Sequence, residues 1–294
     1  ANTSQKPQVV IDAIAEHYGQ HNANVARAMH RLGLEATQAF EGGRERIAQF
    51  LGANRPEEVV ALSNASEALN LAANTLGTRL GPRDEVVITI MEHHSNLVPW
   101  QLVCERTGAK LRWFDITDDG QLDLDKAERE GLINEHTKVV SLALASNVLG
   151  TINPVQRIAQ WAHQVGAVVV VDASQAVPQM PVDVTELGVD LLAFTGHKML
   201  GPTGIGILWG RYDLLDDLPP FLGGGEMIEV VRMTGSTYAK PPHRFEAGTP
   251  PIAQLTALAV AADYLDEVGM AAIAQREHRL AALMLEGLGS VPGV

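Results

Sequence analysis

The chain has 294 residues, 46% of them hydrophobic, and a formal net charge of −13 at pH 7. This length and apolar content can bury a large core, as one large α/β domain or as a large domain with part of a small one. The acidic balance disfavours nucleic acids and anionic membranes as partners, because both require neutralising basic side chains.

The chain contains no apolar run of the roughly 20 residues that a membrane span needs, and its N-terminus lacks a basic-then-apolar signal pattern. Its one cysteine, Cys104, excludes an internal disulfide framework and fits a reducing compartment. We therefore predict a cytoplasmic protein, or one in an organelle reached by a signal already removed. Because the chain begins without Met and stops just after a helical pattern, we expect it to be incomplete at both ends.

Short β-branched segments alternate with amphipathic segments along the middle of the chain. The pairs are 58–62 with 66–77, 85–90 with 96–106, and 138–144 with 154–165, followed by a strand over 167–172. Such alternation is typical of βαβ units on a largely parallel sheet that is covered on both faces.

Two further strands, at 190–194 and 204–209, are separated by a short gap, so we predict a hairpin and a mixed sheet. Residues 222–250 are rich in Gly, Pro and Thr without a clear period, which indicates a functional loop. Helical patterns resume at 251–267 and 270–288. We predict an α/β protein with an N-terminal helical segment (1–50), a large domain (51–265) and the start of a small C-terminal domain (266–294).

Two apolar strands each deliver a chemically useful group at their C-terminal end. One ends at Asp172, and the other continues through Thr195-Gly-His to Lys198. In open α/β sheets, ligands bind beyond these strand ends. An acid that keeps a ring nitrogen protonated and an amine that forms an imine are what a pyridoxal cofactor requires. Either residue alone is more often an ordinary loop residue, so the prediction depends on the pair.

Ser63–Asn70 follows a strand and offers hydroxyls and helix-start N–H groups, which suit a phosphate, although an ordinary N-cap with an acid in the first turn gives the same pattern. The next strand-to-helix junction carries His93 and His94. His93 could stack on a flat ring and shuttle protons. We do not favour a metal here, because no Cys, Asp or His joins the pair at ligand spacing.

Seven motifs in series resemble those of group II cysteine desulfurases, in the class V aminotransferase-like branch of fold-type I pyridoxal-phosphate (PLP) enzymes. They are Glu92-His-His-Ser-Asn-Leu-Val-Pro-Trp100, Ser146-Asn-Val-Leu-Gly150, Val171-Asp-Ala-Ser-Gln-Ala176, Gly196-His-Lys198, Gly201-Pro-Thr-Gly-Ile-Gly206, Gly223-Gly-Gly-Glu-Met227 and Phe245-Glu-Ala-Gly-Thr-Pro250. The resemblance implies a large domain with a mostly parallel seven-stranded mixed sheet covered by helices, PLP as cofactor, and a homodimer.

The resemblance also implies roles for single residues. Lys198 is similar to the Schiff-base lysine, and Asp172 to the partner of the pyridinium nitrogen. Gln175 matches a donor to the ring oxygen, and His93 the stacking histidine that acts in acid–base steps. The phosphate would be held by Ala65 (through its backbone), Ser66, Thr195 and His197.

Two more residues match positions that face the substrate or a second subunit. Asn147 is similar to a residue that contacts the substrate and the cofactor oxygen, and Thr249 to a threonine that reaches the phosphate of the neighbouring subunit. Arg27 and His30 are retained from a family motif, and we predict that Arg27 contacts the substrate. Ala26, however, stands where the family usually has a histidine.

The implied activity is conversion of L-cysteine to L-alanine, with Lys198 removing the α-proton and an enzyme cysteine taking the sulfur as a persulfide for iron–sulfur cluster assembly or other sulfur-requiring biosynthesis. A sulfur-acceptor protein is a possible partner. Family chains continue further, and that continuation holds the persulfide cysteine and a carboxylate-binding arginine. We predict that this chain alone binds PLP poorly or reversibly and lacks sulfur transfer. Cys104, in a helical pattern, is expected to be a buried small hydrophobe.

Two alternative functions remain open. One is another class V enzyme, namely a selenocysteine lyase, a kynureninase-like hydrolase or an epimerase, which would keep Asp172 and Lys198 and differ in its substrate groups. The other is a non-catalytic partner in iron–sulfur assembly. An intact Asp172 and Lys198 disfavour the second alternative, because a scaffold needs neither residue.

Overall fold

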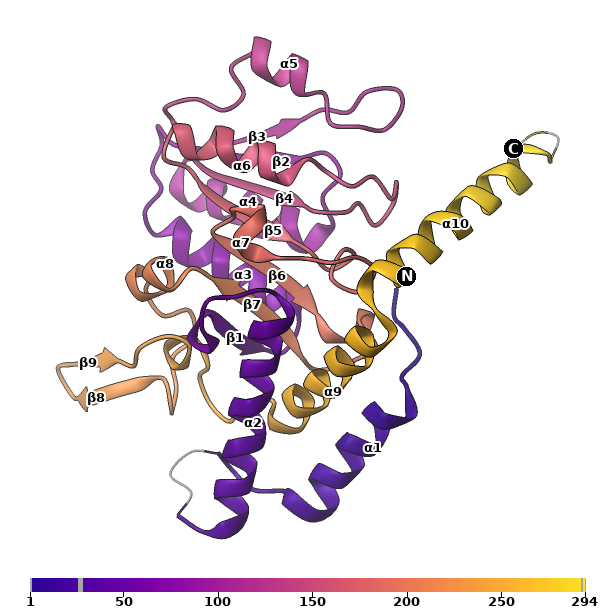
Figure 1. The fold of residues 1–294 in the computed structure, drawn as a ribbon. Helices are drawn as coiled ribbons and strands as arrows, with labels where there is room; N and C mark the ends of the chain where they lie inside the picture. Colours follow the sequence, from indigo (N-terminus) through magenta and orange to yellow (C-terminus); the bar gives the residue numbers. More distant parts are fainter. Residues whose placement is uncertain (1, 26–28, 292, 294) are drawn as a thin grey trace.

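The computed structural model describes residues 2–25, 29–291 and 293. Their main feature is a seven-stranded mixed sheet in the order β1-β7-β6-β5-β4-β2-β3 (Figure 1). The strands are β1 (Val59–Leu62), β2 (Glu85–Thr89), β3 (Lys110–Phe114), β4 (Thr137–Ala143), β5 (Val168–Asp172), β6 (Leu191–Thr195) and β7 (Gly206–Gly210). Strand β7 is antiparallel to both of its neighbours, and the other pairings are parallel.

The sheet is covered on both faces, which explains why its central strands are continuous apolar runs. In β5, Val169 and Val171 pack into one core cluster while Val170 packs into the other. Residues of α3 (Ala65–Gly77), α4 (His94–Thr107) and α8 (Tyr212–Asp217) belong to the cluster of Val170. Residues of α2 (Arg31–Phe50), α6 (Val155–Gln164), α7 (Val184–Leu187) and α9 (Ile252–Val268) belong to the cluster of Val169 and Val171.

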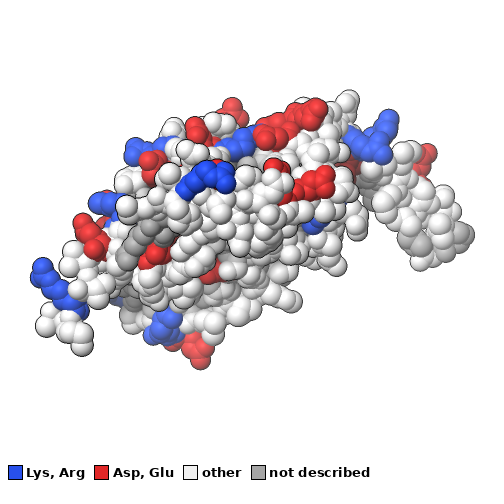
Figure 2. All heavy atoms as spheres, turned by 90° about the horizontal axis from the view of Figure 1, so that it is seen from below, with Lys and Arg blue, Asp and Glu red and all other residues white. Residues whose placement is uncertain are grey.

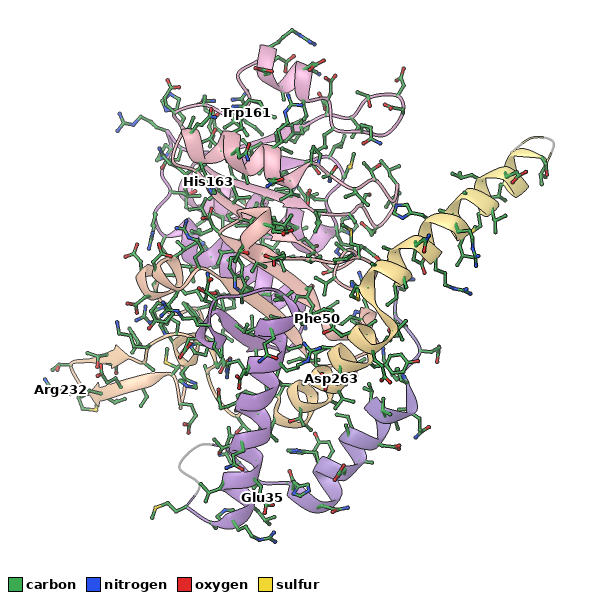
Figure 3. The ribbon with its side chains drawn as sticks, in the orientation of Figure 1. Glu35, Phe50, Trp161, His163, Arg232 and Asp263 are labelled. Carbon is green, nitrogen blue, oxygen red and sulfur yellow. The ribbon has the colours of Figure 1, made fainter. Side chains whose placement is uncertain are left out.

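The remaining elements lie around this body. Helix α1 (Gln8–Glu16) packs on α9, and the short α5 (Leu124–Arg129) follows β3. Helix α10 (Met270–Gly289) extends away from the sheet (Figure 1), and none of its residues is buried. The hairpin of β8 (Ile228–Arg232) and β9 (Gly235–Tyr238) also projects from the body, with Arg232 near its tip (Figure 3).

Side-chain contacts also join two of the sheet-covering helices, α2 and α9. Arg46 on α2 forms ion pairs with Asp263 and Asp266 on α9. In Figure 3, Asp263 lies on the part of α9 that passes Phe50, the last residue of α2. The two helices therefore form one layer of the structure, bound by charge as well as by apolar packing.

The predicted α/β class, the alternation of strands and helices and the antiparallel pairing of β6 with β7 are confirmed. Residues 222–250, predicted as a functional loop, contain a hairpin that was not predicted, because β8 and β9 pair over 228–238, and the functional role of the segment stays a prediction. Every residue of this hairpin except Ile228 is exposed, so no buried face imposes an apolar alternation on its sequence. The division into 1–50, 51–265 and 266–294 stays a prediction.

The surface carries charges of both signs. In Figure 2, Lys and Arg side chains are scattered among Asp and Glu side chains, and no single basic patch dominates the face shown. Among the helices of the described residues, none is long and apolar enough to cross a membrane.

Candidate active site

A pocket opens at the carboxyl edge of the sheet, where β1, β2, β4, β5 and β6 all end. Because these strands run in the same direction, residues that are far apart in the sequence meet there. The pocket is lined by Asn64, Ala65, Ser66, His93, Ser95, Ala143, Ala145, Asn147, Asp172, Ser174, Gln175, Thr195 and Lys198. It therefore brings together eight of the residues singled out from the sequence: Ala65, Ser66, His93, Asn147, Asp172, Gln175, Thr195 and Lys198.

Asp172 and Lys198 come from neighbouring strands of the sheet. Asp172 ends β5 and is buried, and its Oδ1 accepts a hydrogen bond of 2.9 Å from the backbone N–H of Ser174. Lys198 ends a single 3-10 turn (Gly196–Lys198) that follows β6. Among the described residues, neither Asp172 Oδ2 nor Lys198 Nζ has a hydrogen-bond or ion-pair partner within the chain. One carboxylate oxygen and one amine are therefore available to a ligand in this pocket.

The start of α3 also lines the pocket. Asn64 caps the helix by accepting from the N–H of Glu67 at 2.9 Å, and Glu67 Oε2 accepts from the N–H of Ser63 at 2.6 Å. Because the first N–H groups of a helix have no intrahelical partner, those of Ala65 and Ser66 remain for an anion. Gly206 on β7 allows this approach, since a Cβ there would overlap the backbone of Asn64 and Ala65. Asn64 is therefore an ordinary N-cap, and the N–H groups of Ala65 and Ser66 next to it still form a candidate phosphate site.

His93 is positioned by the helix that follows it. It is the N-cap residue of α4, and its Nδ1 accepts from the N–H of Ser95 at 3.2 Å and lies 2.6 Å from Ser95 Oγ. The ring of His94 lies beside it, with 5.9 Å between the ring centroids. The described part of the chain contains no group of three or more His, Cys, Asp or Glu side chains that could hold a metal ion.

His197 does not line this pocket. Its backbone carbonyl accepts hydrogen bonds from the N-terminal segment: Thr3 Oγ1 at 3.0 Å, Ser4 N–H and Oγ at 3.1 Å, and Lys6 Nζ at 2.7 Å. The pKa of its imidazole is lowered, chiefly by burial and also by the positive charges of Lys198 and Lys6. The N-terminal segment therefore braces the turn that carries Lys198.

The remaining residues singled out from the sequence do not line this pocket or lie outside the described residues. Thr249 is exposed and lines a separate pocket with Ser63 and Glu67, rather than the Lys198 pocket. Arg27 and Ala26 lie outside the described residues. The sulfur of Cys104 is no candidate nucleophile, because it is buried in α4 and burial raises the pKa of its thiol to about 11.

Sequence reasoning missed several members of the site. Ser95 and Ser174 line the pocket without having been assigned a role, and Asn64 lines it from within the Ser63–Asn70 segment that was predicted to suit a phosphate. Their proximity to Ser66, His93 and Asp172 was the available signal. The N-terminal brace had no such signal, because Lys6 contacts a carbonyl 191 residues away.

The chain matches the aminotransferase class-V family model over residues 1–294. It therefore belongs to this family, whose fold is that of fold-type I PLP enzymes. A Streptomyces coelicolor protein described as a probable cysteine desulfurase is 57% identical over 99% of this chain and 71% of its own length. A Haloferax volcanii protein described as a cysteine desulfurase is 48% identical over 96% of this chain and 66% of its own length.

Solved structures show the same relationship. A cysteine desulfurase from Thermococcus onnurineus has a TM-score of 0.93 and 42% identity, over 98% of this chain and 71% of that one. The cysteine desulfurase CsdA from Escherichia coli has a TM-score of 0.91 and 35% identity, over 99% of this chain and 73% of that one. This chain thus spans about 70% of the length of these relatives.

Proposed function

We propose that the protein is a PLP-dependent cysteine desulfurase that converts L-cysteine to L-alanine and passes the sulfur to an enzyme cysteine as a persulfide. The observation that carries this proposal is the pocket at one sheet edge that is lined by Lys198, by the buried Asp172 and by the start of α3. The relatives named above are cysteine desulfurases by description, and a further relative, SspA, has a TM-score of 0.77 and 26% identity to this chain and was solved in complex with cysteine.

The residues of the pocket fit PLP. The open helix start at Ala65 and Ser66, together with the Thr195 hydroxyl, suits the phosphate. Asp172 Oδ2, which has no partner within the described residues, suits a protonated ring nitrogen. His93 would stack on the ring, and Gln175 would donate to the ring oxygen. Within this proposal His197 supports the phosphate side through the position of its turn rather than from the pocket lining.

The chemistry divides between cofactor and protein. Bound PLP supplies an electron-withdrawing ring and a carbon that amines attack. Lys198 Nζ would hold the cofactor and, when released, take the α-proton of the substrate. The negative charge of Asp172 would keep the ring nitrogen protonated, because an opposite charge favours the charged form. His93 would give or take protons near the substrate, and Asn147 and Arg27 would orient it.

The assembly and its setting also belong to the proposal. We propose a homodimer in which Thr249 contacts the cofactor phosphate of the second subunit, and its position outside the Lys198 pocket supports that role. The proposed sulfur destination is iron–sulfur cluster assembly or another sulfur-requiring pathway, through a sulfur-acceptor protein, in the cytoplasm. In solution, a stable monomer that still holds PLP tightly would contradict the shared site.

The reaction products distinguish the proposed function from the alternative functions. In the complete protein, L-cysteine should yield L-alanine, with the loss of activity in Asp172→Asn exceeding any loss of stability. Faster turnover of selenocysteine or of kynurenine, or conversion of an amino acid to its epimer, would assign one of the other class V reactions. A protein that binds no PLP and releases no alanine would instead support a non-catalytic role in iron–sulfur assembly.

A further inference from the structure

A buried hydrogen-bond network adjoins the Lys198 pocket, and Glu92 lies at its centre. The carboxylate accepts from Thr89 Oγ1 at 2.6 Å, from Asn96 Nδ2 at 2.6 Å and from the backbone N–H of Ala143 at 3.0 Å. The Oδ1 of Asn96 in turn accepts from Ser141 Oγ at 2.7 Å. These residues come from β2, α4 and β4, and all of them are buried.

The network adjoins two residues that line the pocket, His93 and Asp172. Glu92 directly precedes His93, the N-cap of α4. Ala143, whose N–H it holds, lines the pocket and is the register partner of Asp172 in the β4–β5 pairing. We propose that Glu92 is a positioning residue whose ionised carboxylate ties the turn that carries His93 to the end of β4 beside Asp172.

The electrostatics make this carboxylate responsive to pH. Burial, and secondarily the charge of Asp172, raises the pKa of Glu92 to about 7, while its hydrogen bonds from Thr89, Asn96 and Ala143 oppose that rise. Asp172 on β5 is the charged group that acts on Glu92, His93 follows it in the sequence, and its three hydrogen-bond donors are uncharged. All three donors suit the ionised form, because a carboxylate only accepts hydrogen bonds.

The position of the charge also has a consequence for the site. An ionised Glu92 adds negative potential next to Asp172, and this favours a proton on a ring nitrogen held there. This consequence rests on the proposed function, whereas the mechanical coupling of Glu92 to Ala143 does not. The two can therefore be tested separately.

The test is Glu92→Gln, which keeps the shape of the side chain but places an NH2 group opposite at least one donor. Glu58→Gln is the matched control: Glu58 is also buried, and it accepts from Trp209 Nε1 at 3.2 Å and from the N–H of Asn54 at 3.1 Å before β1, at the other edge of the sheet. Both variants of the complete protein are measured without cofactor and with added PLP.

In the cofactor-free protein, Glu92→Gln should speed hydrogen–deuterium exchange at the Ala143 amide by up to roughly tenfold, because the acceptor of that amide becomes an uncharged amide oxygen or is replaced by an NH2 group. With PLP, its dissociation constant should rise by roughly tenfold or more. The wild-type dissociation constant should also change with pH around 7 through the titration of Glu92, and Glu92→Gln should remove that part of the change while the titration of the cofactor phosphate remains. Glu58→Gln should match the wild type in all three measurements.

The proposal is overturned if Glu92→Gln leaves Ala143 exchange and PLP binding unchanged, or if Glu58→Gln changes them equally. Should Glu92→Gln fail to fold, Thr89→Val decides: it removes one donor to Glu92, and it should shift both measurements in the same direction by a smaller factor, so unchanged values would overturn the proposal. If the wild type itself binds no PLP, the proposed function fails, while Ala143 exchange still tests the coupling.

Discussion

Two regions beside the pocket each contain a buried glutamate, and they stabilise it in opposite ways. Glu246, in the loop before α9, pairs with Arg44 of α2 at 2.7 Å and accepts from the N–H of Ala61 on β1 at 2.7 Å. This pairing overcomes the cost of burial and lowers the pKa of Glu246 to about 2. Glu92 has only neutral donors and the nearby Asp172, and its pKa rises to about 7.

The difference lies in what each region does. The Arg44–Glu246 pair joins α2, β1 and the loop that leads to Thr249. Because the pKa of Glu246 is low, this carboxylate stays ionised over the whole neutral range. The Glu92 network lies against the candidate cofactor pocket, where a carboxyl group that titrates near neutral pH can respond to a bound ligand. A permanent ion pair therefore suits a structural joint, and an unpaired acid suits a site.

The largest expected effect comes from breaking the ion pair. Arg44→Met should lower the free energy of unfolding by about 3–5 kcal/mol, because it removes the main cationic partner of the buried Glu246 and leaves it only the longer contact with His243 at 3.7 Å. Urea unfolding measures this loss. The double variant Arg44→Met/Glu246→Leu should recover a large part of it, and a double variant no more stable than Arg44→Met would show that the joint depends on more than charge.

The pH dependence of stability should separate the two acids. Because the folded pKa of Glu92 is raised from 4.5 to about 7, its contribution to stability is greatest below pH 4.5 and falls by up to about 3 kcal/mol as the pH rises through 7. The lowered pKa of Glu246 gives the reverse: its contribution is present above pH 4.5 and is lost as the pH falls towards 2.

Unfolding of the wild type, Glu92→Gln and Glu246→Gln across this range provides the measurement. The wild type should lose stability relative to Glu92→Gln between pH 4.5 and 7, and relative to Glu246→Gln below pH 4.5. Two parallel pH curves for the wild type and Glu92→Gln would rule out titration of Glu92 near neutrality.

A smaller effect is expected at the start of α3. Gly206→Ala would force β7 against the backbone of Asn64 and Ala65, which should cost about 1–3 kcal/mol, the usual range for overpacking. PLP binding should weaken as well, because the same contact sets the helix start. Gly224→Ala, whose Cβ would only contact Ala247 at an ordinary distance, serves as the control.

The smallest effect is expected for an exposed ion pair. Lys240 contacts Asp216 at 2.8 Å, with the lysine side chain largely in solvent. Lys240→Gln should leave the urea midpoint unchanged, because water and salt screen such pairs. A clear loss of stability here would mean that pairing itself, rather than burial, explains the strength of the Arg44–Glu246 joint.

Much of the fold followed from the sequence because burial dictates its pattern. The four valines of β5 are apolar on both faces, and the polar groups after β5 and β6 mark where the strands end. Edge elements carried a weaker signal: β3 has only Phe114 buried, and β8 and β9 have no buried residue.

The candidate site was predictable where residues lie at or shortly after strand ends: Asp172 and Thr195 end β5 and β6, and His93 lies in the turn between β2 and α4. Contacts that depend on tertiary packing could not be predicted from the sequence. Lys6 on the His197 carbonyl, Glu246 on Ala61 and Glu92 on Ala143 each join segments at least 51 residues apart, and no local pattern encodes such partners.

The central claim is that Lys198 binds the cofactor opposite Asp172. Reduction of the PLP-loaded complete protein with borohydride, followed by peptide mapping, tests it most directly. The pyridoxyl group should appear on Lys198, and Lys198→Ala should retain none. A pyridoxyl group on Lys138 or Lys240, with Lys198 unlabelled, would contradict the assignment of the site.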